Sequence, residues 1–267
     1  MKMGLATMNN ENTKPRQRFL ALDSATTTLA VAIMENNELL HEINVNGERN
    51  HSVHMHPVIA RAVEEAGLTV NDIEGITVGV GPGSYTGVRM AVTAAKTLSW
   101  AKKIPVVGVS SLHAIAWGSL AYGLKEEKTG QERHWIIPLL DARRGQAYTA
   151  LFIGGTADAP IRVEADAIRL MATWVDVLSE RLKSHNEEEM PAAIWFTGDV
   201  AVHAEAAERL REVYHGPVHI LPYELEGRWV GLLGAKRLLN GESDEMHALV
   251  PNYTQLSEAE ANLLRKR

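Results

Sequence analysis

The order of the predicted secondary-structure elements constrains this chain more than any other feature of the sequence. Three short apolar strands come first, and Asn36-Asn37 is a good tight-turn pair between the second and the third, so these strands should pair antiparallel. Each later strand follows a helix, which is the pattern of parallel strands joined by helical crossovers. The sequence thus predicts a mixed sheet flanked by helices. The strands are predicted at residues 19–23, 29–34, 39–45, 76–80 and 106–109, and the helices at 57–66, at about 87–101 and after Ser110-Ser111.

The second half of the chain looks like a shorter version of the first. A hairpin is predicted from residues 135–140 and 146–153, around the segment Asp141-Ala-Arg-Arg-Gly145. We therefore expect two related α/β units rather than one. The predicted boundaries are a flexible extension at 1–17, a first domain at 18–112, and a second domain at 113–267 whose last helix packs back on the first. The other elements predicted in the second unit are a helix at about 170–184, a strand at 194–197 that leads into Gly198-Asp199, and a helix at about 202–213.

Composition narrows the class of protein. The 267 residues are enough for two modest domains, and the absence of cysteine rules out disulfides, thiolate metal sites and cysteine nucleophiles. A net charge of −6 argues against an autonomous nucleic-acid-binding protein. The first sixteen residues hold no apolar run like that of a signal peptide, and no segment has the length and apolarity of a membrane span. We expect a cytoplasmic protein without a membrane partner.

The first candidate site is the turn that follows the first strand. Asp23 ends the strand, and the next five residues are small and mostly hydroxylated. Amides and hydroxyls in such a turn, including those of Thr26 and Thr27, can hold phosphate oxygens, and a strand-end aspartate can orient a metal or a water. The alternative is a hydroxyl-rich turn whose side chains satisfy its own backbone. Both interpretations stay open at this level.

The glycine-rich segment Gly81-Pro82-Gly83-Ser84-Tyr85-Thr86-Gly87-Val88-Arg89 is a second candidate, because it follows a strand and opens a helix whose amides could face an anion. It does not match the dinucleotide-binding fingerprint, since Thr86 stands where the third glycine belongs, and it lacks the Gly-Lys-Ser/Thr ending of a phosphate-binding P-loop. The alternative is a tight strand-to-helix turn in which Ser84 caps the helix.

The helix at 87–101 lacks a strongly polar face. One side carries Val88, Val92 and Ala95, and the opposite side carries small or weakly polar residues such as Ala94 and Thr97. Such a helix is either covered by its own protein or available to a partner. The sequence favours neither interpretation over the other.

Metal binding and nucleophilic catalysis find little support. His51, His54 and His56 precede the predicted helix at a spacing that does not share one helical face, and no acidic residue joins them before Glu64. The sequence contains no Gly-x-Ser-x-Gly elbow and no His-Glu-x-x-His motif. We expect these histidines to be ordinary surface residues.

Several motifs taken together resemble one family, the bacterial TsaB (YeaZ-like) proteins. The resemblance covers about residues 18–261, and the glycine-proline-glycine segment with its following Thr-Gly-x-Arg is its most specific part. The motifs that carry it, in order, are the Asp23 turn, Arg49-Asn50-His51-Ser52, the segment 81–89, Asp141-Ala-Arg-Arg-Gly145, Val250-Pro251-Asn252-Tyr253 and Ala259-Glu260.

The resemblance implies a fold of two actin-like (RNase H-like) halves and an accessory function. TsaB proteins bind and support TsaD, the subunit that transfers threonylcarbamoyl to adenosine in tRNAs that read codons starting with A, together with a TsaE-like ATPase. In the TsaD relative, two histidines of a His-x-x-x-His motif bind a metal, and Ser111 and Ile115 stand at the matching positions here. Serine and isoleucine cannot replace imidazole ligands. The resemblance therefore implies a non-catalytic subunit, with ATP, ADP and metal belonging to its partners and with mainly indirect contact to tRNA.

The resemblance also assigns candidate residues. It implies a helix-on-helix interface with TsaD, or with a second copy of this chain when TsaD is absent, and it places two phosphate-loop positions of the fold at the Asp23 turn and at Gly198-Asp199. A glycine usually follows the first aspartate in active members, and Ser24 replaces it here, so we expect weak or no ATP binding. The rival functions are a small-molecule kinase of the same fold and a metal-independent peptidase. The interface residues expected are Val58, Ile59, Val63, Arg89, Met90, Ala94 and Thr97.

Overall fold

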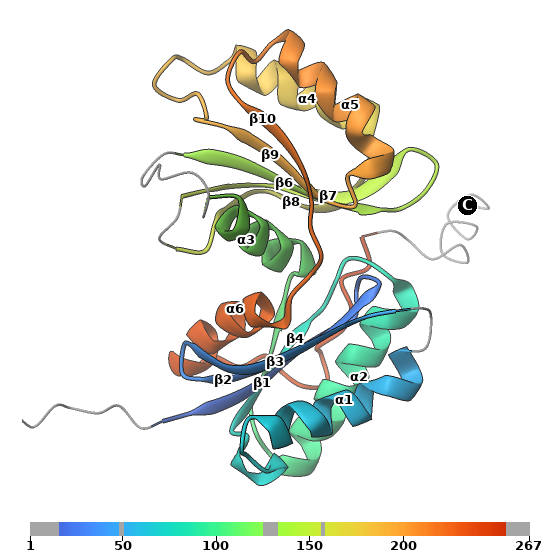
Figure 1. The fold of residues 1–267 in the computed structure, drawn as a ribbon, viewed down its shortest axis with the longest axis vertical. Helices are drawn as coiled ribbons and strands as arrows, with labels where there is room; N and C mark the ends of the chain where they lie inside the picture. The colour runs from blue at the N-terminus through green and yellow to red at the C-terminus, as the bar shows by residue number, and fades with distance from the viewer. Residues whose placement is uncertain (1–15, 48–50, 125–132, 156–157, 255–267) are drawn as a thin grey trace, which may run out of the picture.

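In the computed structural model the described residues are 16–47, 51–124, 133–155 and 158–254, and they form two α/β halves (Figure 1). The predicted extension at 1–17 lies almost entirely outside them, as do Arg49-Asn50 and Ala259-Glu260 of the family motifs. The sheet of the first half has the order β3-β2-β1-β4-β5, in which β1 pairs antiparallel with β2 and parallel with β4. The predicted mixed sheet is thereby confirmed. Its strands are β1 (Arg18–Asp23), β2 (Thr28–Glu35), β3 (Glu38–Asn46), β4 (Gly75–Gly79) and β5 (Val106–Val109).

The second half repeats this arrangement. Its sheet has the order β10-β9-β6-β7-β8, with β6 antiparallel to β7 and parallel to β9. Started from β8, this is the same order and the same set of strand directions as in the first sheet. The chain therefore has the predicted fold of two related α/β halves, each a mixed sheet flanked by helices. The strands are β6 (His134–Asp141), β7 (Gln146–Gly154), β8 (Ile161–Leu170), β9 (Ile194–Gly198) and β10 (Val218–Pro222).

The helices form layers around and between the two sheets. In Figure 1, α1 and α2 cover the outer face of the first sheet, α3 and α6 lie between the sheets, and α4 and α5 cover the outer face of the second. Each layer contact holds its own buried apolar cluster. The helices are α1 (His51–Glu65), α2 (Tyr85–Lys102), α3 (Ser111–Leu124), α4 (Met171–Lys183), α5 (Ala204–Glu208) and α6 (Gly227–Leu239), and the 3-10 segments are η1 (Val70–Asp72), η2 (Ala201–His203) and η3 (Arg209–Glu212).

The last described helix, α6, packs closely on the sheet of the first half although it follows the second half in the chain. A Cβ added at Gly234 would lie only 2.0 Å from Oγ1 of Thr77 on β4, so the glycine permits the close approach of helix and sheet. Arg228 pairs with Glu42 of β3, and the amide of Gly227 donates to Oδ1 of Asn44 at 3.0 Å. These contacts attach α6 to the first half, and α6 also packs against α3 between the two sheets.

Three local predictions differ from the structure. Helix α1 begins at His51 rather than at residue 57, so Pro57 lies inside it and has no amide to donate to the carbonyl of Val53 one turn earlier. Strands β8 and β10 were not predicted, and the last helix was predicted without bounds. Strand β8 lacks the usual pattern because Ile161 is 73% exposed while Arg162 on the other face is half-buried. The helix predicted at 202–213 is broken into the short segments η2, α5 and η3.

Candidate functional site

The turn after β1 is closed around the carboxylate of Asp23. This side chain is fully buried: its Oδ2 accepts a hydrogen bond from Oγ of Ser111 at 2.6 Å, and its Oδ1 accepts one from the amide of Ala25 at 2.6 Å. Burial raises the pKa of the Asp23 carboxyl to about 6, against the opposing effect of these two hydrogen bonds. Thr26 Oγ1 bonds within the same turn, and Thr27 is exposed. Asp23 therefore lies inside the protein and not at the edge of an open site.

The glycine-rich segment before α2 packs against this turn. The amide of Ser84 donates to the carbonyl of Ala25 at 2.7 Å, and Oγ of Ser24 donates to the carbonyl of Gly87 at 2.7 Å. A Cβ at Gly87 would lie 1.8 Å from the carbonyl oxygen of Ser24, and a Cβ at Gly83 would lie 2.3 Å from that of Ala25. The glycines thus allow two turns of the same chain to touch. Polar groups of the two turns therefore form hydrogen bonds with each other.

Two further amides of the segment are also satisfied internally. The amide of Gly87 donates to Oγ of Ser84 at 3.3 Å, which caps α2 as the sequence predicts. The amide of Gly81 donates to Oγ of Ser111 at 3.1 Å, and Ser111 in turn bonds Asp23. Ile115, at the second metal-ligand position of the TsaD relative, is fully buried in the core. The positions that the resemblance compares with metal ligands therefore stabilise the interior here.

The second predicted phosphate-loop position lies in the other half. Gly198 has a φ of 96°, and a Cβ there would lie 2.4 Å from the carbonyl oxygen of Leu139. Asp199 accepts a hydrogen bond at Oδ2 from the amide of Asp141 at 3.1 Å, across the carboxyl ends of β9 and β6. Asp23 and Asp199 are each bonded within their own half. Among the described residues, no group of three or more histidine, aspartate or glutamate side chains could hold a metal ion.

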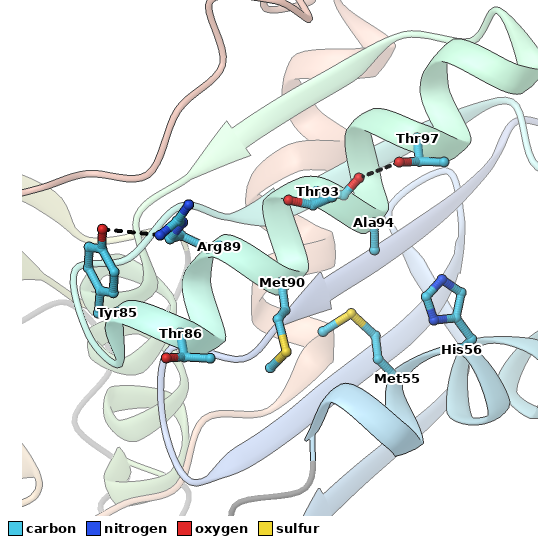
Figure 2. Close-up of a pocket in the computed structure, with 9 residues that line it drawn as sticks. All are labelled: Met55, His56, Tyr85, Thr86, Arg89, Met90, Thr93, Ala94 and Thr97. Carbon is cyan, nitrogen blue, oxygen red and sulfur yellow. Dashed lines mark hydrogen bonds between the residues drawn. The ribbon is translucent and has the colours of Figure 1, made fainter.

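A groove lies between α1 and α2 on the first half (Figure 2). It encloses about 590 Å³. Figure 2 shows the side chains of Met55 and Met90 in the space between the two helices. At one end, NH1 of Arg89 donates to Oη of Tyr85 at 3.1 Å, and the ring of Tyr253 lies 5.6 Å from that of Tyr85. The residues that line the groove, called here the α1–α2 groove, are Met55, His56, Tyr85, Thr86, Arg89, Met90, Thr93, Ala94 and Thr97.

The groove contains four of the seven predicted interface residues, namely Arg89, Met90, Ala94 and Thr97. The other three require a correction, since they lie in this chain's own core. Val58, Ile59 and Val63 are 9%, 6% and 2% exposed and pack between α1 and the first sheet. Helix α2 is the crossover between the parallel strands β4 and β5. One of its faces packs on the sheet and the other lines the groove.

Five residues of the groove were missed. Met55 and His56 were missed because α1 was predicted to begin only at residue 57, which placed both outside the helix. Thr86 and Thr93 share a helical face with Met90 at spacings of three and four residues, and this spacing could have identified them. Tyr85 was assigned only to the glycine-rich motif.

Comparison with known proteins finds relatives along most of the chain. The family model described as "TsaD: tRNA N6-adenosine threonylcarbamoyltransferase" matches residues 38–262. The tRNA threonylcarbamoyladenosine biosynthesis protein TsaB of Bacillus subtilis is 31% identical over 263 residues, which cover 93% of this chain and 99% of the relative. TsaB of Escherichia coli is 32% identical over 136 residues, 50% of this chain and 54% of the relative. Within the described residues, no helix is long and apolar enough to cross a membrane.

Solved structures show the same fold. The crystal structure of YeaZ from Pseudomonas aeruginosa is 20% identical, covers 89% of this chain and 99% of its own, and superposes with a TM-score of 0.66. A second structure from Pseudomonas aeruginosa, of a protein with similarity to peptidase YeaZ, gives a TM-score of 0.68 at 21% identity over 90% of this chain and all of its own. The duplicated fold, the glycine-rich segment closed on the Asp23 turn, and the match along nearly the whole of a curated relative lead to one assignment: the chain belongs to the TsaB proteins of tRNA threonylcarbamoyladenosine biosynthesis, within the family that the TsaD model describes.

Proposed function

We propose that this chain is a non-catalytic subunit that binds a TsaD-like catalytic subunit through the α1–α2 groove. The observation that carries the proposal is the α1–α2 groove itself, which lies on the outer face of the first half and is lined mainly by apolar groups. No element of the described chain covers it. A partner helix laid between α1 and α2 would bury the methionines and approach closely over Ala94 and the threonines of α2.

The side chains of the groove suit such a partner. Met55 and Met90 are flexible and polarisable, and they can adapt to the shape of an apolar helix face. Tyr85 is 58% exposed, and it holds Arg89 beside it, so the end of the groove offers an aromatic and a cationic anchor of the types enriched at protein interfaces. A second copy of this chain is the occupant we propose when the catalytic subunit is absent.

The non-catalytic part of the proposal is supported by the closed first turn. A kinase of this fold needs an aspartate that faces Mg-ATP, whereas the carboxylate of Asp23 is bonded to Ser111 and to the amide of Ala25. We propose that the chain binds no nucleotide or metal tightly, and that ATP, ADP and metal belong to the TsaD-like and TsaE-like subunits. Most of the tRNA surface would then also be bound by the partners.

The test is assembly with the purified TsaD-family partner, measured by calorimetry and on a sizing column. Thr93→Arg places a long cation in the groove at an exposed position, so the fold should persist while the partner is repelled. We expect affinity to fall by roughly 100-fold or more, the loss of a well-packed interface contact. Thr173→Arg, on the exposed side of α4 in the other half, is the matched control and should bind as the wild type does. Equal affinity of the Thr93→Arg variant and the wild type would refute the interface.

A further inference from the structure

The turn between β6 and β7 carries an unusual backbone that the proposed function does not use. Arg143 and Arg144 have φ values of 66° and 53°, and Gly145 follows with a φ of 73°. Left-handed backbone is common for glycine, whereas two consecutive arginines in it are unusual and strained. Strain of this kind persists only where the surrounding structure holds it, and it is concentrated at functional sites.

Hydrogen bonds from three directions hold this turn. Within it, the amide of Arg143 donates to Oδ1 of Asp141 at 3.0 Å, and the amide of Gln146 donates to the carbonyl of Arg143 at 2.9 Å. From β9, Oδ2 of Asp199 accepts from the amide of Asp141, and from the start of α4, the amide of Met171 donates to the carbonyl of Gly145 at 2.9 Å. The backbone from which both arginine side chains project is therefore fixed in advance.

The two guanidinium groups have no acidic partner among the described residues, and both residues are exposed. Other arginines of the same half are paired: Arg181 with Glu164, and Arg209 with Asp176. Arginine stays charged at any physiological pH, so the turn presents two uncompensated positive charges on a chain whose net charge is −6. Two free guanidinium groups on a fixed backbone are suited to an anion, and their planar donor geometry matches phosphate oxygens.

The position of the turn in the fold indicates which kind of anion it could meet. In Figure 1, the β6–β7 hairpin, the loop that leads into α2 and the end of the described chain extend to the same side of the molecule. Helix α2, whose first residue Tyr85 lines the groove, also begins on this side. Since the family acts in tRNA modification, the polyanion present in its reaction is RNA.

We infer that the Arg143–Arg144 turn is a phosphate-backbone contact for the tRNA in the assembled complex. The contact carries no sequence preference, because guanidinium groups that reach phosphates position a nucleic acid and do not identify its bases. It adds a defined contact from this acidic chain to the larger RNA surface of the catalytic subunit. The inference rests on the proposed function insofar as the partner supplies that larger surface.

The test is a titration of the wild-type complex and its variants with an unmodified tRNA transcript that reads a codon starting with A. The variant R143N/R144N removes both charges, and asparagine tolerates left-handed backbone well, so the turn should fold. We expect affinity for the tRNA to fall roughly 3- to 30-fold at ~0.1 M salt, and the slope of log affinity against log salt to fall by about 1.5, the value for two phosphate contacts. R143K/R144K should retain most of the salt dependence.

The matched control is R209Q/R211Q, which removes two exposed arginines of η3. Arg209 pairs with Asp176, and Arg211 pairs with Glu208. This control makes the same change in net charge and should leave tRNA affinity within about twofold. Equal losses in the control and in R143N/R144N would overturn the inference, as would unchanged tRNA affinity in R143N/R144N. Loss of partner binding by R143N/R144N with no separate effect on RNA would also overturn it, and would assign the turn to a protein interface.

A parallel titration with this chain alone, at low salt, separates the inference from the proposed function. If the wild-type chain does not assemble with its partner, the proposed function fails, but the turn can still be tested. A weaker tRNA complex of R143N/R144N than of R209Q/R211Q in that titration supports the phosphate contact. Identical behaviour of the two variants contradicts it.

Discussion

Replacing Asp23 with asparagine should make the stability of the protein less dependent on pH. A carboxyl whose pKa is higher in the folded than in the unfolded chain stabilises the fold below its unfolded pKa, and this stabilisation is lost as pH rises through the folded pKa. For Asp23 the two values are about 6 and 3.8, so the loss falls between about pH 4 and pH 7. The difference corresponds to about 3 kcal/mol, and the side chain is fully buried, so solvent screens little of it.

Asparagine has nearly the same shape as aspartate and cannot ionise. Its carbonyl can accept the bond from the amide of Ala25, and its NH₂ group can donate to Oγ of Ser111, although the orientation of that hydroxyl must change. The difference in unfolding free energy between Asp23→Asn and the wild type should therefore move by about 2–3 kcal/mol in favour of the variant as the pH rises from 4 to 7. Urea unfolding monitored by circular dichroism at several pH values measures this difference, and titrations shared by both proteins cancel.

Asp72→Asn is a control with the opposite sign. Hydrogen bonds from the side chain and the amide of Thr69 lower the pKa of Asp72, so its contribution is present above the unfolded pKa and is lost as the pH falls. The Asp72 variant should be less stable than the wild type at neutral pH and should approach it on acidification. A difference between Asp23→Asn and the wild type that does not change with pH would refute the account of a buried, protonatable Asp23.

Two further substitutions test the packing of the fold. Gly87→Ala should destabilise the protein by roughly 2–4 kcal/mol, because the added Cβ meets the backbone of Ser24. Gly47→Ala is the control and should be nearly neutral, because the space around its Cβ is open. Chemical unfolding of both variants measures the difference. Asp166→Ala should cost about 2 kcal/mol, since it leaves the half-buried guanidinium of Arg162 without its ion-pair partner, and a thermal shift no larger than that of an exposed alanine substitution would contradict this.

The sequence predicts the first sheet strand by strand because the relevant information is local. Apolar runs of four to eight residues, an Asn36-Asn37 turn and intervening helical periodicity determine which strands pair antiparallel and which are joined by crossovers. Strand β8 could not be predicted in the same way, since its charged side chains are held by partners from other elements. The carboxylate of Asp166, for example, accepts from Oγ of Ser110 at 2.7 Å across the two halves.

The interface prediction failed in part for a related reason. On α1, the apolar stripe marks the face that packs on the sheet, so Val58 and Val63 are core residues. The side of α1 that lines the groove lies next to this stripe and has no apolar periodicity of its own. On α2, both faces are apolar or small, and the sequence cannot tell which one the sheet covers. Packing of Ala91 against the sheet leaves Ala94 and Thr97 at the groove, and this choice depends on tertiary structure.

The glycine-rich segment shows why a motif typical of anion binding also has a purely structural explanation. A phosphate cradle needs glycine because the ligand must approach the backbone closely, and a turn packed on another turn needs glycine for the same steric reason. In this chain the space beside the segment is filled by Ser24, whose hydroxyl bonds the carbonyl of Gly87 and whose own carbonyl would meet a Cβ there. The glycines show only that another group comes close to this backbone. In this chain that group is Ser24, the residue that follows Asp23.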